Sequence, residues 1–176
     1  MAFYFCCTGD DKVFITFSGK IKNNNESIVK VTNYNSTLKQ EIAIDSLGNF
    51  SGPVLIEKDG YYFFQIGRFY TTVRFEKGYN VDVSIDMDDF FKSISYSGEM
   101  KNINNYNVAK AQLRSKQVGN SKEYFVVPLS EFLPKIEKTR DTLFYLLQKS
   151  GLDKKDVAIE KKIIEYEYLQ TYNNYK

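Results

Sequence analysis

The residues best suited to chemistry are two adjacent cysteines, Cys6 and Cys7, and a group of aspartates between positions 82 and 89. A reactive thiol needs a neighbouring base, yet the 176 residues include no histidine. This removes the commonest general base, every Ser-His or Cys-His nucleophile pair and all histidine-containing zinc motifs. No C-x-x-C occurs, so the minimal dithiol redox site is also missing. We therefore expect the chain not to be an enzyme, with a thiol enzyme using either cysteine as the alternative.

The two cysteines lie where an apolar stretch, residues 2–7, gives way abruptly to the polar residues 8–11. This junction is similar to the end of a secretory signal followed by the acylated cysteine of a bacterial lipoprotein. It predicts Cys7, or else Cys6, as a lipidation site and a periplasmic or membrane-anchored location in the bacterial cell envelope. The alternative is a disordered tail with two free thiols. In both cases residues 1–11 lie outside the folded domain.

The aspartates are close enough in sequence to suggest a hard cation such as calcium. However, Asp82 and Asp86 occupy the solvent side of an alternating strand pattern, and Asp88 and Asp89 follow where that strand ends or a helix starts. The glycine and the bidentate glutamate of a calcium loop are missing. Phosphate loops of the GxxxxGK[ST] and GxGxxG types and a G-x-S-x-G elbow are missing too. We expect no metal site and no cofactor.

Aromatic residues are concentrated between positions 61 and 70. Strand alternation places Tyr62, Phe64 and Ile66 on one face, where they would form core. The other aromatic side chains are candidates for stacking on a sugar ring or contacting a protein, with core packing as the alternative. The candidate ligand or partner contacts are Tyr61, Phe63, Phe69 and Tyr70.

These residues must be positioned by strands, because the hydrophobic pattern from Lys12 to about Gly98 has a period of two. Residues 79–86 alternate strictly, and residues 71–75 do the same. The turn Glu76-Lys77-Gly78 between them predicts a β-hairpin. The remaining predicted strands are Val13–Ser18, Ile28–Tyr34, Leu38–Ile44, Val54–Glu57, Tyr61–Ile66 and Ser93–Tyr96.

About eight short strands without intervening helices predict an antiparallel β-sandwich over residues 12–100. After Gly98 the apolar spacing becomes helical, which predicts a helical segment over residues 101–176. Its expected helices span 101–116, 130–150 and 153–172, and the last two form an antiparallel hairpin because their connection is short. The predicted fold class is mainly β with C-terminal α: an antiparallel β-sandwich followed by an α-helical hairpin.

The composition limits the class of partner. A hydrophobic content of 43% is sufficient for a core, whereas a net charge of +2 lacks the basic excess of a nucleic-acid-binding protein. Basic and acidic residues alternate along the predicted helices, which is typical of a solvated face. We expect no nucleic-acid partner.

A succession of short motifs resembles the N-terminal β-domain that precedes the thioredoxin fold in bacterial envelope thiol–disulfide oxidoreductases of the TlpA/AhpC-TSA group. That domain typically has a GKI opening strand, a D-x-x-G-x-F turn, a G-Y-Y strand, an x-x-K/P-G hairpin and a G…N-Y closing segment. The resemblance covers roughly residues 13–110, and residues 111–176 resemble the helical connector of that family. The matching segments here are Phe17–Ile21, Asp45–Phe50, Gly60–Tyr62, Tyr70–Val81, Ser95–Gly98 and Asn104–Tyr106.

The resemblance implies a non-catalytic accessory domain of such an oxidoreductase, since the C-x-x-C of the family has no counterpart here. The implied partner is a protein or a covalently linked thioredoxin-like domain, with membrane attachment through a lipid anchor. The alternative is a stand-alone envelope binding module that holds a glycan or peptide on its exposed aromatic residues.

Overall fold

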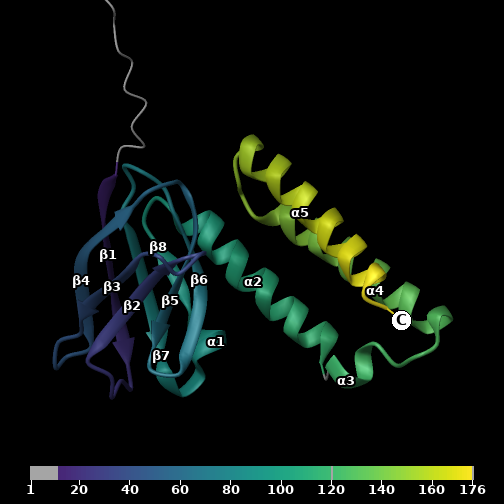
Figure 1. Ribbon diagram of the computed structural model, residues 1–176, viewed down its shortest axis with the longest axis horizontal. Coiled ribbons are helices and arrows are strands. Elements are labelled where there is room, and N and C mark those ends of the chain that lie inside the picture. The colour runs from purple at the N-terminus through teal and green to yellow at the C-terminus, as the bar shows by residue number, and fades with distance from the viewer. Residues whose placement is uncertain (1–11, 120, 176) are drawn as a thin grey trace, which may run out of the picture. The chain divides into compact units, whose positions relative to one another are not determined.

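The computed structural model describes residues 12–119 and 121–175, and the chain divides into two compact units between Met100 and Lys101 (Figure 1). The first unit contains eight strands and two short helical turns, and the second contains four helices. The cysteine pair lies outside the described residues. No helix in the described part of the chain is long and apolar enough to cross a membrane.

The first unit is a sandwich of two four-stranded sheets, ordered β4-β1-β7-β8 and β3-β2-β5-β6. The predicted β-sandwich followed by a helical hairpin is thus confirmed, with one parallel strand pair, β1 with β7. The strands are β1 (Val13–Lys22), β2 (Ile28–Asn33), β3 (Lys39–Ala43), β4 (Asn49–Ile56), β5 (Gly60–Ile66), β6 (Phe69–Phe75), β7 (Val81–Asp86) and β8 (Ser95–Ser97).

An aromatic cluster joins the two sheets. Phe17 on β1 is fully buried, and its ring meets those of Phe50, Phe64 and Phe75 edge-on at centroid distances of 5.1, 5.5 and 5.2 Å. Phe50 belongs to the same sheet as Phe17, whereas the other two rings come from the facing sheet. Edge-to-face contacts of this kind add to the free energy gained by burying the rings.

The predicted hairpin of residues 71–86 is wrong. β6 pairs with β5 in one sheet, whereas β7 pairs with β1 and β8 in the other. The intervening segment crosses between sheets, and the Asn80 side chain anchors it by accepting a hydrogen bond from the Thr16 backbone N–H at 2.8 Å. An alternating pattern specifies which side chains are buried but not which strand lies alongside. The turn residues after Phe75 predict a hairpin within one sheet, whereas in the structure the chain crosses there from one sheet to the other.

The turn between β3 and β4 is built on the Asp45 carboxylate. It accepts hydrogen bonds from the backbone N–H groups of Leu47 and Asn49 at 2.9 and 2.7 Å. The Asn49 side-chain amide also donates to it, and these bonds hold the pKa of Asp45 below its ordinary value. Gly48 lies in this turn with φ of +79°, a conformation that favours glycine. The carbonyl of Gly48 accepts a bond from the Ile21 N–H at 2.7 Å, which ties the turn to β1.

The second unit begins with α2 (Lys101–Val118) and α3 (Ser121–Tyr124), which are followed by α4 (Leu129–Lys149) and α5 (Lys154–Asn173). The predicted pairing of the last two helices is confirmed, and Figure 1 shows them side by side. Asp153 caps the N-terminus of α5 by accepting a hydrogen bond from the Asp156 N–H at 2.8 Å. The connection before this cap uses Gly151, whose φ is +67° and whose carbonyl accepts a bond from the Asn102 amide.

Candidate functional site

Two of the aspartates between positions 82 and 89 form hydrogen bonds that stabilise the sandwich. Asp82 accepts hydrogen bonds from the hydroxyls of Ser18 and Ser97 at 2.9 and 2.8 Å, and so links β1, β7 and β8. Asp86 accepts bonds from the Asn23 amide and from the Asp88 N–H, and thereby caps the turn η1 (Met87–Asp89). The Asn23 bond is the main reason that the pKa of Asp86 is lowered. Within residues 12–119 and 121–175, no three Asp, Glu, Cys or His side chains form a group suited to a metal ion.

Three of the four predicted aromatic contacts lie on the outer face of the β3-β2-β5-β6 sheet. Tyr61 and Phe63 project from β5, while Tyr70 projects from β6 beside Gln65. Phe63 and Gln65 point outward because their neighbours Phe64 and Ile66 are fully buried on the inner side. Alternation along β5 places Tyr61 and Phe63 on the outer face, and the pairing of Gln65 with Tyr70 places Tyr70 on the same face.

Phe69, the fourth predicted contact, lies on the inner side and belongs to a separate aromatic cluster. It pairs across the strands with the buried Ile66, and its ring stacks on that of Phe90 at 5.0 Å with an interplanar angle of 14°. Phe90 begins the short helix α1 (Phe90–Ser93), and the ring of Phe91 meets Phe69 edge-on at 6.0 Å. The structure thus places Phe69 in packing, apart from the other three aromatic residues.

The outer face contains a groove of about 380 Å³. Tyr70 is the most exposed aromatic residue in it, at 65%, and Phe63 forms part of its wall. Tyr61 lies outside the groove, where the Arg74 guanidinium sits 5.6 Å from the centre of its ring. The groove is lined by Lys30, Thr32, Lys39, Gln40, Glu41, Phe63, Gln65 and Tyr70.

Polar side chains surround the two aromatic rings of this groove. Lys30 on β2 pairs with Glu41 on β3 at 3.7 Å, and both side chains are about half exposed. Gln65 donates a hydrogen bond to the Gly67 carbonyl at 2.6 Å, so its amide oxygen is held at the surface. Hydrogen-bond donors and acceptors therefore lie next to an exposed ring on one sheet face, an arrangement suited to a polyhydroxylated ligand.

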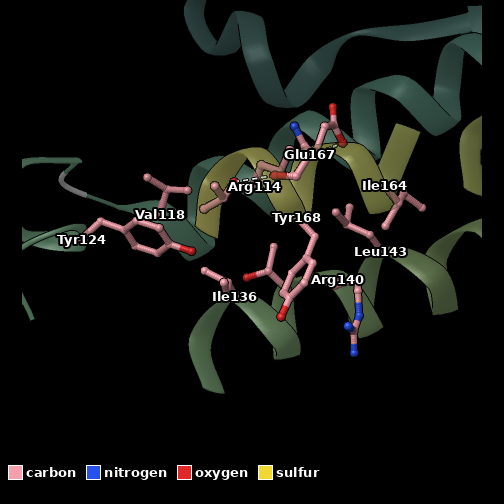
Figure 2. Close-up of a pocket in the computed structure, with 11 residues that line it drawn as sticks. Arg114, Val118, Tyr124, Ile136, Arg140, Leu143, Ile164, Glu167 and Tyr168 are labelled. Atoms are coloured by element: carbon pink, nitrogen blue, oxygen red, sulfur yellow. Dashed lines mark hydrogen bonds and ion pairs between the residues drawn. The ribbon is translucent and has the colours of Figure 1, made fainter. Parts of the chain in front are cut away.

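A second cavity, of about 190 Å³, lies in the helical unit (Figure 2). Its wall is formed by side chains from α2, α3, α4 and α5, of which four are aliphatic, two are tyrosines and five are polar or charged. The lining residues are Arg114, Val118, Tyr124, Ile136, Thr139, Arg140, Leu143, Ile164, Glu167, Tyr168 and Thr171.

Charged and hydroxyl groups occur at defined points of this helical pocket. Arg114 on α2 forms an ion pair with Glu167 on α5. The Tyr124 hydroxyl is hydrogen-bonded to Thr139, and burial raises the pKa of this tyrosine. The Arg140 guanidinium lies over the Tyr168 ring, 4.8 Å from its centre. The pocket thus combines an apolar interior with a few fixed polar groups, as small-molecule sites do.

Sequence reasoning missed the helical pocket. Arg114 and Glu167 are 53 positions apart, so no local spacing connects them. The only available signal was the mixture of charges on the predicted helices, which we interpreted as solvated faces. An arginine and a glutamate in the middle of partly apolar helices are equally compatible with an ion pair inside a helical bundle.

Comparison of the chain with protein-family models, with curated proteins and with solved structures finds no match.

Proposed function

We propose that this chain is a non-catalytic binding module that holds an oligosaccharide on the outer face of its β3-β2-β5-β6 sheet. The observation that supports this most directly is the groove in which the exposed Tyr70 and the ring of Phe63 lie among lysine, glutamate, glutamine and threonine side chains. Sugar rings present an apolar face to an aromatic ring and direct their hydroxyls sideways.

The groove provides both kinds of contact at the scale of a sugar. Tyr70 and Phe63 supply apolar surface on neighbouring strands, while the ion pair of Lys30 with Glu41 supplies a donor and an acceptor. All these side chains project from paired strands, so the sheet sets the spacing of the backbone positions that carry them. A surface of this type binds and orients a ligand without breaking bonds in it.

Titration of the full chain with hexasaccharides of glucose, N-acetylglucosamine, mannose and xylose tests the proposal. We expect one of them to give saturable amide chemical-shift changes centred on Tyr70 and Gln65. Tyr70→Ala should weaken that affinity about fivefold, since an aromatic contact contributes about 1 kcal/mol. Tyr145→Ala is the matched control, because Tyr145 is exposed to a similar extent, at 62%, but lies on α4.

Three outcomes would contradict the glycan proposal. The first is the absence of saturable binding to any of the four hexasaccharides at millimolar concentration. The second is a peptide that binds at the same face when no sugar does, which would assign the groove to a protein ligand. The third is an equal loss of affinity in Tyr70→Ala and Tyr145→Ala, which would show that the sugar does not bind in this groove.

The setting that we propose for this module is an envelope protein of the thiol–disulfide oxidoreductase type, in which it acts as an accessory domain. Two glycines of the motifs that carry the resemblance occupy positions in the sandwich where another residue would clash or be strained. A Cβ on Gly19 would lie 2.2 Å from the Val83 carbonyl oxygen, and Gly48 needs its positive φ. These residues support a shared β-domain architecture, and Cys7 would provide the lipid anchor in this setting.

The natural gene tests this setting. We expect the reading frame to continue beyond the codon for Lys176 and to encode a thioredoxin-like segment containing W-C-x-x-C. A stop codon directly after Lys176 would contradict the accessory role and leave the binding module standing alone. Sequencing of the genomic locus distinguishes the two results without any assay of activity.

A further inference from the structure

We infer that the pocket between α2, α3, α4 and α5 binds a small aromatic molecule that carries a neutral hydrogen-bond acceptor. Its volume is about 190 Å³. A protein cavity of about 150 Å³ lined by apolar side chains accommodates benzene, so this pocket has room for a ring with one small substituent. The pocket lies in the helical unit, so the inference is independent of the groove on the sheet.

The interior of the helical pocket is apolar. Ile136, Leu143 and Ile164 line it and are at most 2% exposed, and the aromatic ring of Tyr168 completes the wall (Figure 2). A water molecule in such a space would find few of the two to four polar partners that it needs. An apolar ring gains the contacts that water cannot make, and this favours an aromatic ligand.

The acceptor is recognised by Arg114. Its Nη2 is bonded to the Glu167 carboxylate, while its Nε is buried and has no hydrogen-bond partner among the described residues. A buried N–H group without a hydrogen bond raises the free energy of the protein, and a ligand acceptor bonded to it would remove that cost. The guanidinium charge is already balanced by Glu167, so a neutral carbonyl suits the position better than a carboxylate does.

Four other polar side chains of the pocket have partners within the protein, one of them Arg140, which donates to the Asp141 carboxylate at 3.0 Å. Thr139 donates its hydroxyl to the Lys135 carbonyl at 2.9 Å, and Tyr124 is bonded to Thr139. Thr171 donates its hydroxyl to the Glu167 carbonyl at 2.7 Å. The Nε of Arg114 is a buried polar atom of this lining without a hydrogen-bond partner among the described residues, and we assign to it the selection between ligands of the same shape.

Two shape-matched probes test the inference on the full chain. Acetophenone carries a carbonyl oxygen where 2-phenylpropene carries a methylene group, and each has one ring and one small substituent. We expect both to cause saturable methyl and amide shifts at Ile136, Leu143 and Ile164 in NMR titrations. Acetophenone should bind about tenfold more tightly, because only its oxygen pairs with the charged donor.

Variants distinguish the contribution of the hydrogen bond to Arg114 from that of the apolar contacts in the pocket. Arg114→Lys keeps a cation for Glu167 but lacks Nε, so it should weaken acetophenone about tenfold and leave 2-phenylpropene unchanged. Val118→Trp should fill the pocket from the end of α2 and abolish binding of both probes. Tyr166→Ala, an exposed position on α5, should leave both affinities unchanged.

The absence of saturable shifts from either probe at millimolar concentration would overturn the inference. Shifts that centre on exposed aromatic residues rather than on the three buried aliphatic ones would also overturn it. Equal affinity for the two probes, together with unchanged affinities in Arg114→Lys, would show that the pocket does not recognise a hydrogen-bond acceptor. If Val118→Trp does not fold, the probe pair and Arg114→Lys still decide the question.

Discussion

Val83→Asp should destabilise the sandwich by about 4 kcal/mol or more, which is a large part of the free energy of unfolding of an ordinary domain. Val83 is fully buried in the middle of β7, between Gly19 on β1 and Tyr96 on β8. An aspartate there would place a carboxylate among the buried apolar side chains of the inner face. Urea unfolding of the full chain, followed by circular dichroism, measures the change in the free energy of unfolding.

Ser84→Asp is the matched control for this variant. It introduces the same charge one position along the same strand, on the exposed face and opposite Lys20 on β1. We expect a change within about 0.5 kcal/mol, as for most surface substitutions. Asp82→Val should cost about 1 kcal/mol, since it removes the two serine hydroxyl bonds at the surface. Equal effects of Val83→Asp and Ser84→Asp would contradict the orientation of β7.

Lys110→Met should destabilise the helical unit by about 3–5 kcal/mol. Lys110 on α2 donates to the Glu160 carboxylate on α5 at 2.6 Å, and the two side chains are only 14% and 1% exposed. The substitution keeps most of the apolar stem but takes away the cation that faces a buried carboxylate. Loss of that cation is severe because the Glu160 side chain is almost wholly shielded from water, which could otherwise solvate the carboxylate. Urea unfolding with helical ellipticity as the signal measures the effect.

A double variant identifies the cause. Lys110→Met combined with Glu160→Leu removes both charges and should recover most of the lost stability, because an apolar pair often replaces a buried ion pair without cost. Lys138→Met, at an exposed position of α4, removes one positive charge and should change stability by less than about 0.5 kcal/mol. A double variant as unstable as Lys110→Met alone would exclude the stranded carboxylate as the cause.

Local pattern was a sound guide to which side chains of a strand point inward. In β7 the apolar residues Val81, Val83 and Ile85 are buried, and Asp82 and Ser84 between them are exposed. The same rule placed Tyr61, Phe63 and Tyr70 on one outer face. Burial follows from alternation because consecutive side chains of a strand leave opposite sides of the backbone.

The alternating pattern does not specify which strands pair with each other. Two features of the structure illustrate this. The hairpin of residues 71–86 does not exist, because β7 joins β1 in parallel in the opposite sheet. Phe69 is an inward residue of β6 that meets Phe90 and Phe91 of the short helix α1, which follows β7 in the chain. Both depend on contacts between segments that are not neighbours in a local pattern.

The sequence by itself determined the fold class, the change from strands to helices near Gly98 and the faces of the strands, because each is a matter of local period and turn chemistry. Only the tertiary structure decided that Arg114 meets Glu167, that Lys110 meets Glu160, and that a cavity with an arginine at its wall lies among four helices. These features depend on the distance between side chains about 50 residues apart. Such distances arise when whole elements pack together, and no spacing along the chain encodes them.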